Sequence, residues 1–390
     1  MLDSLLTWLL LPLGAMLGWT MAKREPARDA AGEQQAALGG LLNRLADDDP
    51  DQAIATLTHA AEPSDSAVEL HLALGNLFRK RGEVDRALRL HEALLARSTL
   101  EPQQRQQVRF ELAQDYLKAG FLDRAEQLFE ELAAEGVQVV QALEQILAIF
   151  EQGRDWKHAI DAARRLEGAR GESKRAVIAQ YFCELAEEAG SDGNVAEAIK
   201  LARRALDEHK ECVRAWLLLG RVLQGAGDFS AAITAYRHAF DQDPRFLPEV
   251  IAPLGECYAQ ARDAGGYISF LAHARESGGN ALAAVAEARV MRSEGMDATG
   301  HLTAALDAHP SRALLLEFLD AIEKKPEVAA AGLSQPAASL RTAVGKLLES
   351  SPRYRCAHCG FTARALFWQC PTCRQWASIA PIEDSLKTPA

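Results

Sequence analysis

The hydrophobic and small residues of this chain recur with the spacing of paired amphipathic helices. One unit of the pattern runs from Trp216 to Pro244. Large residues there are spaced to fill the gap between two helices, while Gly220 and Ala232 are small enough to let the helices approach closely. Gly227 ends the first helix, and Pro244 stops the second. The unit is therefore predicted to be a helical hairpin.

Further units in register predict a helical repeat protein. Each unit has an alanine at the same position, and the aligned residues are Ala53, Ala87, Ala125, Ala159, Ala198 and Ala232. Their spacing of about 34 residues, stretched by a few residues in two intervals, is the period of the tetratricopeptide repeat (TPR). Another pair begins near Gly255, and Ala-rich degenerate repeats are expected beyond it. The predicted TPR array covers residues 38–325, with clear repeats to about residue 270.

The N-terminal segment 1–22 has the pattern of a transmembrane helix. No charged side chain lies between Ser4 and Ala22, and at about 1.5 Å per residue this stretch covers a hydrocarbon core of about 30 Å. The alternatives are a buried globular helix and a cleaved signal peptide, but a signal peptide has a basic start and this chain has Asp3. Basic residues instead follow the span from Lys23 onward, which predicts a single-pass anchor with the bulk of the chain on the cytoplasmic side. Residues 23–37 are expected to be a juxtamembrane linker.

Two C-x-x-C pairs close to the C-terminus predict a metal site. The candidate ligands are Cys356, Cys359, Cys370 and Cys373. Each pair can form a tight turn whose backbone amides hydrogen bond to the sulfurs, and two facing turns complete a tetrahedral four-thiolate site for one zinc or iron ion. A thioredoxin-type redox pair and a chance grouping of buried thiols are the alternatives, but the flanking Gly360 and Pro371 favour metal-binding turns. The module is assigned to residues 352–382, after a linker at 326–351. Pro326 and Pro336 are expected to break the chain there, so this linker is predicted to be a hinge or a loosely packed helix.

Aromatic residues surround these cysteines and are expected to form the small core of the module. They are Tyr354, Phe361, Phe367, Trp368 and Trp376. So short a module cannot build a sufficient core without a metal ion to hold it together. His358 is expected to face solvent in a turn, because four thiolates already fill the metal shell. The remaining cysteines fall beside apolar residues and are expected to be core thiols; they are Cys183, Cys212 and Cys257.

Composition supports an all-α binding protein and disfavours other functions. Aromatic residues make up 6% of the chain and hydrophobic residues 48%, as in closely packed helical arrays. The 43 basic and 54 acidic residues give a net charge of −11, so a nucleic-acid partner is not expected. The cysteine pattern indicates a metal site in a reducing compartment and not a disulfide framework. The sequence contains no Gly-rich phosphate loop, H-E-x-x-H or G-x-S-x-G motif, so no catalytic residue is assigned and no enzyme is expected.

The order of anchor, TPR array and four-cysteine tail resembles the lipopolysaccharide assembly protein B family over essentially the whole chain. The stretches that carry the resemblance are His71–His91 and Pro352–Thr362. The resemblance implies a rubredoxin-like, or zinc-ribbon, tail whose metal ligands are the same four cysteines. The insert between the pairs is shorter than in a true rubredoxin, and Arg374 stands where that fold usually has glycine. Both departures argue against stand-alone electron transfer.

The resemblance also implies a regulatory function at the bacterial inner membrane. Members of the family restrain lipopolysaccharide synthesis by helping a membrane AAA+ zinc protease to degrade UDP-3-O-acyl-N-acetylglucosamine deacetylase, the enzyme that commits flux to lipid A. Other lipopolysaccharide synthesis or transport proteins are further partners that the resemblance implies. Two alternatives stay open on the sequence: an iron- or redox-responsive metal protein, and a general TPR scaffold for envelope assembly.

Overall fold

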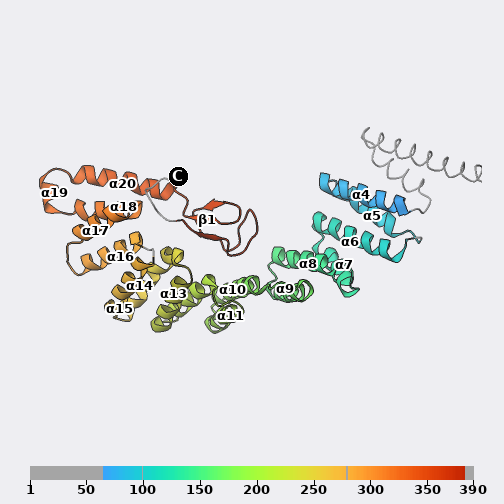
Figure 1. Cartoon of the computed structure of the whole chain (residues 1–390), viewed down its shortest axis with the longest axis horizontal. Coiled ribbons are helices and arrows are strands. Elements are labelled where there is room, and N and C mark those ends of the chain that lie inside the picture. Colours follow the sequence, from blue (N-terminus) through green and yellow to red (C-terminus); the bar gives the residue numbers. More distant parts are fainter. Residues whose placement is uncertain (1–64, 99, 278–279, 383–390) are drawn as a thin grey trace, which may run out of the picture. The chain divides into compact units, whose positions relative to one another are not determined.

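The computed structural model describes residues 65–98, 100–277 and 280–382, and helices make up most of them (Figure 1). The chain divides into two compact units, Met1–Ile149 and Phe150–Ala390. The predicted anchor at 1–22, the linker at 23–37 and the first predicted repeat lie outside the described residues. Within the described ranges no helix combines the length and the apolar character that a membrane crossing requires.

Helices of the first unit pack in the order expected for TPR hairpins. They are α4 (Asp65–Arg81), α5 (Val84–Leu95), α6 (Pro102–Ala119) and α7 (Leu122–Ala134), followed by α8 (Val139–Gly153), which ends beyond the unit boundary. From α4 to α7 each helix packs against the next, and α4 also packs against α6. Ala87 and Ala125 have no exposed surface. The alanine position that defines the repeat is therefore buried where the helices meet.

A buried polar cluster connects three helices of this unit. Asp115 of α6 accepts a hydrogen bond from Arg79 of α4 at 2.7 Å and lies 2.5 Å from Nδ1 of His91 in α5. Arg79 also forms an ion pair with Glu111 at 2.6 Å. The His91 ring lies directly over Gly75, since a β-carbon added there would come within 2.2 Å of Nε2. His91 therefore has the packing role that the sequence analysis favours for repeat histidines.

The second unit contains the remaining helices and a C-terminal sheet. Its helices are α9 (Trp156–Arg170), α10 (Arg175–Ser191), α11 (Val195–Glu208), α12 (Val213–Gly225), α13 (Phe229–Gln242), the 3-10 helix η1 (Pro244–Phe246), α14 (Leu247–Gln260), α15 (Ala264–Glu276), α16 (Asn280–Ser293), α17 (Thr299–Ala308), α18 (Arg312–Glu323), α19 (Pro326–Ala330) and α20 (Ser334–Ser350). From α9 to α18 each α-helix packs against its successor. Paired helices thus continue through the segment beyond residue 270, where the sequence predicts degenerate repeats.

The hairpin of α12 and α13 confirms the roles predicted for its small residues. A β-carbon on Gly220 would lie 2.8 Å from the Tyr236 ring, and Ala232 is fully buried. Gly227 lies between the helices with a φ of 82°, a left-handed conformation that favours glycine. Pro244 follows the end of α13 and opens η1.

The segment 326–351, which the sequence analysis assigns as a linker, is largely helical. Helices α19 and α20 occupy it, and α20 packs against α18. Pro326 and Pro336 do not prevent this, because each lies in the first turn of its helix, where backbone amides have no partner within the helix. Prolines that suggest breaks in the sequence are therefore helix starts in the structure.

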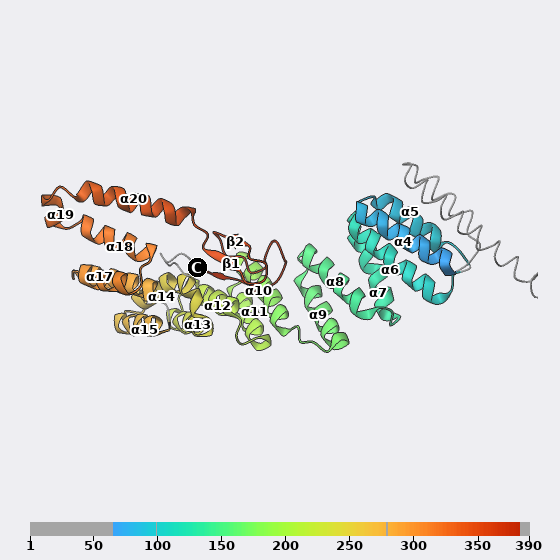
Figure 2. The same cartoon turned by 45° about the horizontal axis from the view of Figure 1, so that its top comes forward.

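A three-stranded antiparallel sheet ends the described chain. Strand β1 (Tyr354–Cys356) pairs with β2 (Thr362–Ala363) on one side and β3 (Ile379–Pro381) on the other. The module formed by residues 352–382 is called the ribbon below. Figures 1 and 2 both show it beside helices of the second unit, and β3 packs against η1.

Candidate metal centre and its contact with the repeats

Two similar turns position the four cysteines of the ribbon. In the first turn the Gly360 amide donates to the Cys356 carbonyl at 3.0 Å. In the second the Arg374 amide donates to the Cys370 carbonyl at 2.8 Å. His358 is exposed in the first turn, as predicted. Each C-x-x-C pair thus forms one compact turn, the local geometry expected from the spacing.

The residue that follows each cysteine pair has a left-handed backbone. The φ angle is 76° at Gly360 and 57° at Arg374. Glycine adopts this conformation freely, whereas a residue with a β-carbon is disfavoured by about 1–2 kcal/mol. The second turn therefore carries backbone strain that the first turn lacks.

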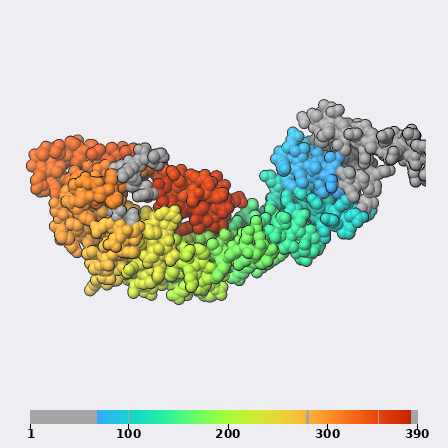
Figure 3. Space-filling model, viewed as in Figure 1, coloured from blue at the N-terminus to red at the C-terminus, as the bar shows by residue number. Residues whose placement is uncertain are grey.

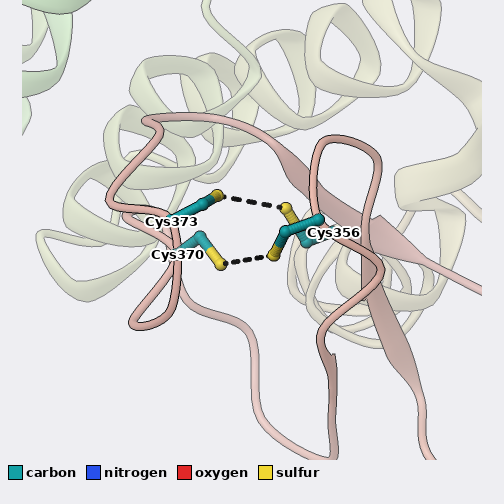
Figure 4. A group of neighbouring side chains, drawn as sticks. Cys356, Cys370 and Cys373 are labelled. Atoms are coloured by element: carbon teal, nitrogen blue, oxygen red, sulfur yellow. Dashed lines mark hydrogen bonds between the residues drawn. The ribbon is translucent and has the colours of Figure 1, made fainter.

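The four sulfur atoms converge on one centre (Figure 4). They lie within 4.8 Å of one another, with Cys356 and Cys373 3.7 Å apart and Cys359 and Cys370 3.6 Å apart. A tetrahedral ion with metal–sulfur bonds of about 2.3 Å needs sulfurs about 3.8 Å apart. The arrangement is consistent with one metal ion in a four-thiolate site, and such a ligand set suits zinc or iron.

Hydrogen bonds to Cys356 favour the thiolate, which is the form that binds metal. The Ser378 hydroxyl donates to Cys356 Sγ at 3.3 Å. This bond, assisted by amides of the first turn and opposed by burial, lowers the pKa of Cys356 to about 6. At Cys373 the Gln375 amide acts to lower the pKa, but burial and the other three sulfurs raise it to about 12. Like charges this close cannot all ionise without a cation, so the cluster is suited to hold a positive ion.

The predicted aromatic core of the ribbon is confirmed for its smaller rings and is wrong for the two tryptophans. Tyr354 and Phe361 do pack with the buried cysteines. Phe367 packs edge-on to Phe361, with ring centroids 6.5 Å apart, although 43% of it is exposed. Trp368 and Trp376 instead contact the helical repeats. The reason is size, because so small a module has too little interior to enclose two indole rings.

Trp376 contacts the helices at the start of the second unit. Its ring lies edge-on to Trp156 of α9 and Tyr181 of α10, with centroid distances of 6.0 and 5.7 Å. Its indole Nε1 donates to Glu151 Oε1 at 2.9 Å, and the Tyr181 hydroxyl donates to the same oxygen at 2.6 Å. Burial, and then the Glu151 charge, raise the pKa of Tyr181 and keep this hydroxyl protonated. One carboxylate thus joins a ribbon side chain to a repeat side chain.

Arg214 of α12 lies beneath both tryptophans of the ribbon. Its guanidinium carbon is 5.7 Å from the Trp368 ring centroid and 5.9 Å from that of Trp376, which are cation–π distances. The side chain is 3% exposed and pairs with Glu184 at 2.8 Å and Glu187 at 3.1 Å. Burial acts to lower the pKa of Arg214, but the neighbouring thiol and acidic groups outweigh it and raise the pKa. The arginine is therefore a fixed, paired cation on the repeat side of this contact.

Two further contacts extend this interface towards η1 and α14. The Trp368 ring stacks on Phe246 with centroids 5.7 Å apart and 8° between the planes. The Tyr354 hydroxyl hydrogen bonds to Glu249. Burial is the largest cause that raises the pKa of Tyr354, and Glu249 adds to it. Figure 3 shows the ribbon, in red, directly against the green and yellow helices.

The sequence analysis did not identify the repeat side of this contact. Its members are Glu151, Trp156, Tyr181, Arg214, Phe246 and Glu249. Arg214 could have been noticed in the sequence, because it is a charged residue among apolar residues at the start of a predicted helix. That signal indicates a buried ion pair, but it does not say that a distant ribbon covers it.

Helical hairpins followed by a four-cysteine ribbon that packs on them define a TPR protein with a C-terminal metal-binding ribbon. Family models agree, because residues 354–381 match the rubredoxin metal binding domain and residues 70–106 and 183–245 match the tetratricopeptide repeat. The chain is 33% identical over 382 residues to lipopolysaccharide assembly protein B of Escherichia coli K12, and 30% identical over 398 residues to that of Haemophilus influenzae. Each match covers 97% of this chain and 98% of the relative. The chain belongs to the lipopolysaccharide assembly protein B family.

Solved structures of TPR proteins are more distant. A crystal structure of MamA protein covers 46% of this chain and 94% of its own, at 17% identity and a TM-score of 0.31. This similarity adds nothing to the family assignment.

Proposed function

We propose that this chain is a membrane-tethered TPR adaptor that regulates lipopolysaccharide biosynthesis. It promotes degradation of UDP-3-O-acyl-N-acetylglucosamine deacetylase by the membrane AAA+ zinc protease, and so limits flux into lipid A. The observation that carries this proposal is the similarity to proteins named lipopolysaccharide assembly protein B over 97% of the chain. Other lipopolysaccharide synthesis or transport proteins are further partners in the same proposal.

The adaptor acts through binding and not through catalysis. Repeated helices offer an extended surface on which protein segments can bind. The anchor predicted at 1–22 would confine the chain to the inner membrane with its bulk in the cytoplasm. Confining adaptor, protease and substrate to one surface raises their effective concentration, so that weak contacts suffice for capture.

The ribbon completes the binding surface in this proposal. Its four cysteines are the ligands of one zinc or iron ion, whose role is to hold the two turns together. The folded ribbon then presents Trp368 and Trp376 to the repeats, where Arg214 and Glu151 meet them. Loss of the metal is therefore expected to disturb the adjoining repeat surface as well as the ribbon.

The test is the half-life of the deacetylase in cells depleted of this protein. Depletion is expected to stabilise the deacetylase, and full-length chain is expected to restore its turnover. The Cys356→Ser, Cys359→Ser double variant should fail to restore turnover, because it removes one half of the metal shell. His358→Ala is the matched control, since this exposed side chain lies in the same turn and offers no sulfur.

Two outcomes would redirect the proposal. An unchanged deacetylase half-life after depletion would refute the degradation step and leave a general envelope scaffold. Normal turnover with the double cysteine variant would remove the ribbon from the mechanism.

Metal analysis of the purified full-length protein separates a structural ion from a redox centre. A colourless, zinc-loaded protein that supports turnover agrees with the structural role. A coloured iron protein that bleaches on reduction, and whose partner binding changes with that reduction, would favour the redox-responsive alternative.

A further inference from the structure

The last helix before the ribbon, α20, has an exposed apolar face. One side of α20 packs against α18, where Val344 is buried and Arg341 pairs with Glu323 at 2.8 Å. Another side is exposed and carries large and small residues in alternation, three or four positions apart, from the N-cap onward: Leu333, Pro336, Leu340, Ala343 and Leu347. This set is called the leucine stripe below.

The leucine stripe is unusual for the end of a helical array. The exposed fractions are 54% for Leu333, 51% for Leu340 and 60% for Leu347. Terminal helices of repeat proteins normally have a polar outer face, because no further repeat covers them. Figures 1 and 2 show α20 at an edge of the second unit, where this face is open to another molecule. The stripe therefore has the character of a surface that a further helix covers.

A second copy of α20 complements the leucine stripe. Spacings of three and four residues keep the stripe on one side of the helix, as in the seam of a coiled coil. In an antiparallel pair related by a two-fold axis, each leucine can face a smaller residue of the other copy, Leu340 against Ala343 and Leu347 against Pro336. The stripe has no charged side chain, so this axis brings no like charges together along it.

We propose that the leucine stripe is the contact between two copies of this chain, with their α20 helices antiparallel. The stripe is about 21 Å long. A helix pair of this length buries less than about 1,200 Å², the lower end of the range for stable interfaces. The contact alone is therefore weak, and a dimer held by it dissociates on dilution.

Confinement to a membrane compensates for the small contact area. Every copy carries the same predicted anchor at 1–22, so copies in one membrane meet at a raised effective concentration. A second copy is also the occupant that is always present where this chain is present. The dimer is therefore expected to form in a membrane and to be lost in dilute detergent solution.

The experiment uses the metal-loaded full-length protein in phosphatidylcholine vesicles, treated with a short bismaleimide cross-linker. Leu340→Cys is expected to give a covalent dimer, because its two copies lie close to the two-fold axis. Leu333→Cys should not, since its two copies lie about 25 Å apart along the helices of an antiparallel pair. Thr342→Cys is the matched control, because this exposed residue of α20 points away from the stripe. Wild-type protein gives the baseline from the native cysteines.

A charge on the stripe tests the same contact independently. Ala343→Cys also lies near the axis and should give the covalent dimer. Adding Leu340→Lys places like charges across the axis and should lower that yield several-fold, whereas adding Thr342→Lys should leave it unchanged. Both changed positions are exposed, so the fold of α20 is expected to stay intact, which circular dichroism checks.

The inference is wrong if Leu340→Cys gives no more dimer than the wild type, or if Leu333→Cys or Thr342→Cys gives as much as Leu340→Cys. It is also wrong if the cysteine at position 340 is shielded from a soluble maleimide in vesicles without any dimer, because lipid then covers the stripe. None of these outcomes depends on the half-life of the deacetylase. Failure of this inference is therefore distinguishable from failure of the proposed function.

Discussion

Arg374 and Gly360 occupy the same place in two otherwise similar turns, and a left-handed backbone suits only the glycine. Arg374→Gly is therefore expected to stabilise the ribbon by about 0.5–1 kcal/mol, because relief of the strain exceeds the added flexibility of the unfolded chain. Gly360→Ala is the converse change and should destabilise the ribbon by about 1 kcal/mol. The rate of metal loss to a chelator measures both effects. Shifts of the same sign in the two variants would show that backbone conformation does not control this stability.

Substitutions at two glycines of α12 distinguish the effect of helix packing from the effect of helix propensity. Gly220→Ala should destabilise the protein by about 1–3 kcal/mol, since the added carbon would lie 2.8 Å from the Tyr236 ring. Gly225→Ala, in the same helix with nothing within 4 Å, should stabilise it by about 0.5 kcal/mol. Thermal unfolding followed by circular dichroism compares them. Similar effects for the two changes would contradict the close approach of α12 and α13.

Short-range patterns made several residues predictable. The cysteines and the turn glycine Gly227 were identified because their spacing alone requires a tight local conformation. The strain at Arg374 was foreshadowed by its departure from the glycine that rubredoxins usually have there. The hydrogen bond from Gln180 to Cys212 was not foreseen, because it depends on how α10 packs on α12.

At the scale of elements, the helical hairpins were predictable, whereas the sequence left the segment 326–351 open between a hinge and a loosely packed helix. Each repeat of the 34-residue pattern is separate evidence for a helix pair, so an ambiguous residue in one repeat does not change the prediction. The last segment has no repeat to support it, and its prolines can mark either a break or a helix start. Only the packing of α20 against α18 distinguishes these two readings.

Removal of the metal should unfold the ribbon and leave the helices in place. The short strands have few apolar contacts, so the metal–thiolate bonds supply most of the stability of the module. A chelator is expected to leave the far-ultraviolet circular dichroism nearly unchanged, while hydrogen exchange becomes fast in residues 354–381. His358→Ala should behave as the wild type. Ribbon amides that stay protected without metal would contradict this account.

At the scale of the whole second unit, the ribbon and the repeats form one structure. This could not be read from the sequence because the partners are remote: Trp376 and Glu151 are 225 residues apart, and Tyr354 and Glu249 are 105 apart. The local sequence pattern identifies the ribbon and the repeats separately, but it does not show which surface of the repeats contacts the ribbon. The tryptophans were therefore assigned to a ribbon core that is too small for them.

Trp376→Ala should loosen the ribbon without emptying its metal site. The change removes two aromatic contacts and the indole donor to Glu151, a loss of about 2 kcal/mol at this interface. Hydrogen exchange of α9 and α10 is expected to rise while metal content stays constant. Phe367→Ala is the matched control, because this ribbon aromatic is 43% exposed. Unchanged exchange in the Trp376 variant would mean that the contact contributes little.

The distance along the chain between the two sides of this interface has a consequence for biosynthesis. Trp156, Tyr181 and Arg214 leave the ribosome well before the ribbon that covers them, and domains generally fold as they emerge. Until the last residues are made and the metal is acquired, this patch of aromatic rings and a buried cation has no cover. The ribbon covers this patch only in a full-length, metal-loaded molecule, so an uncovered patch marks a truncated or immature chain.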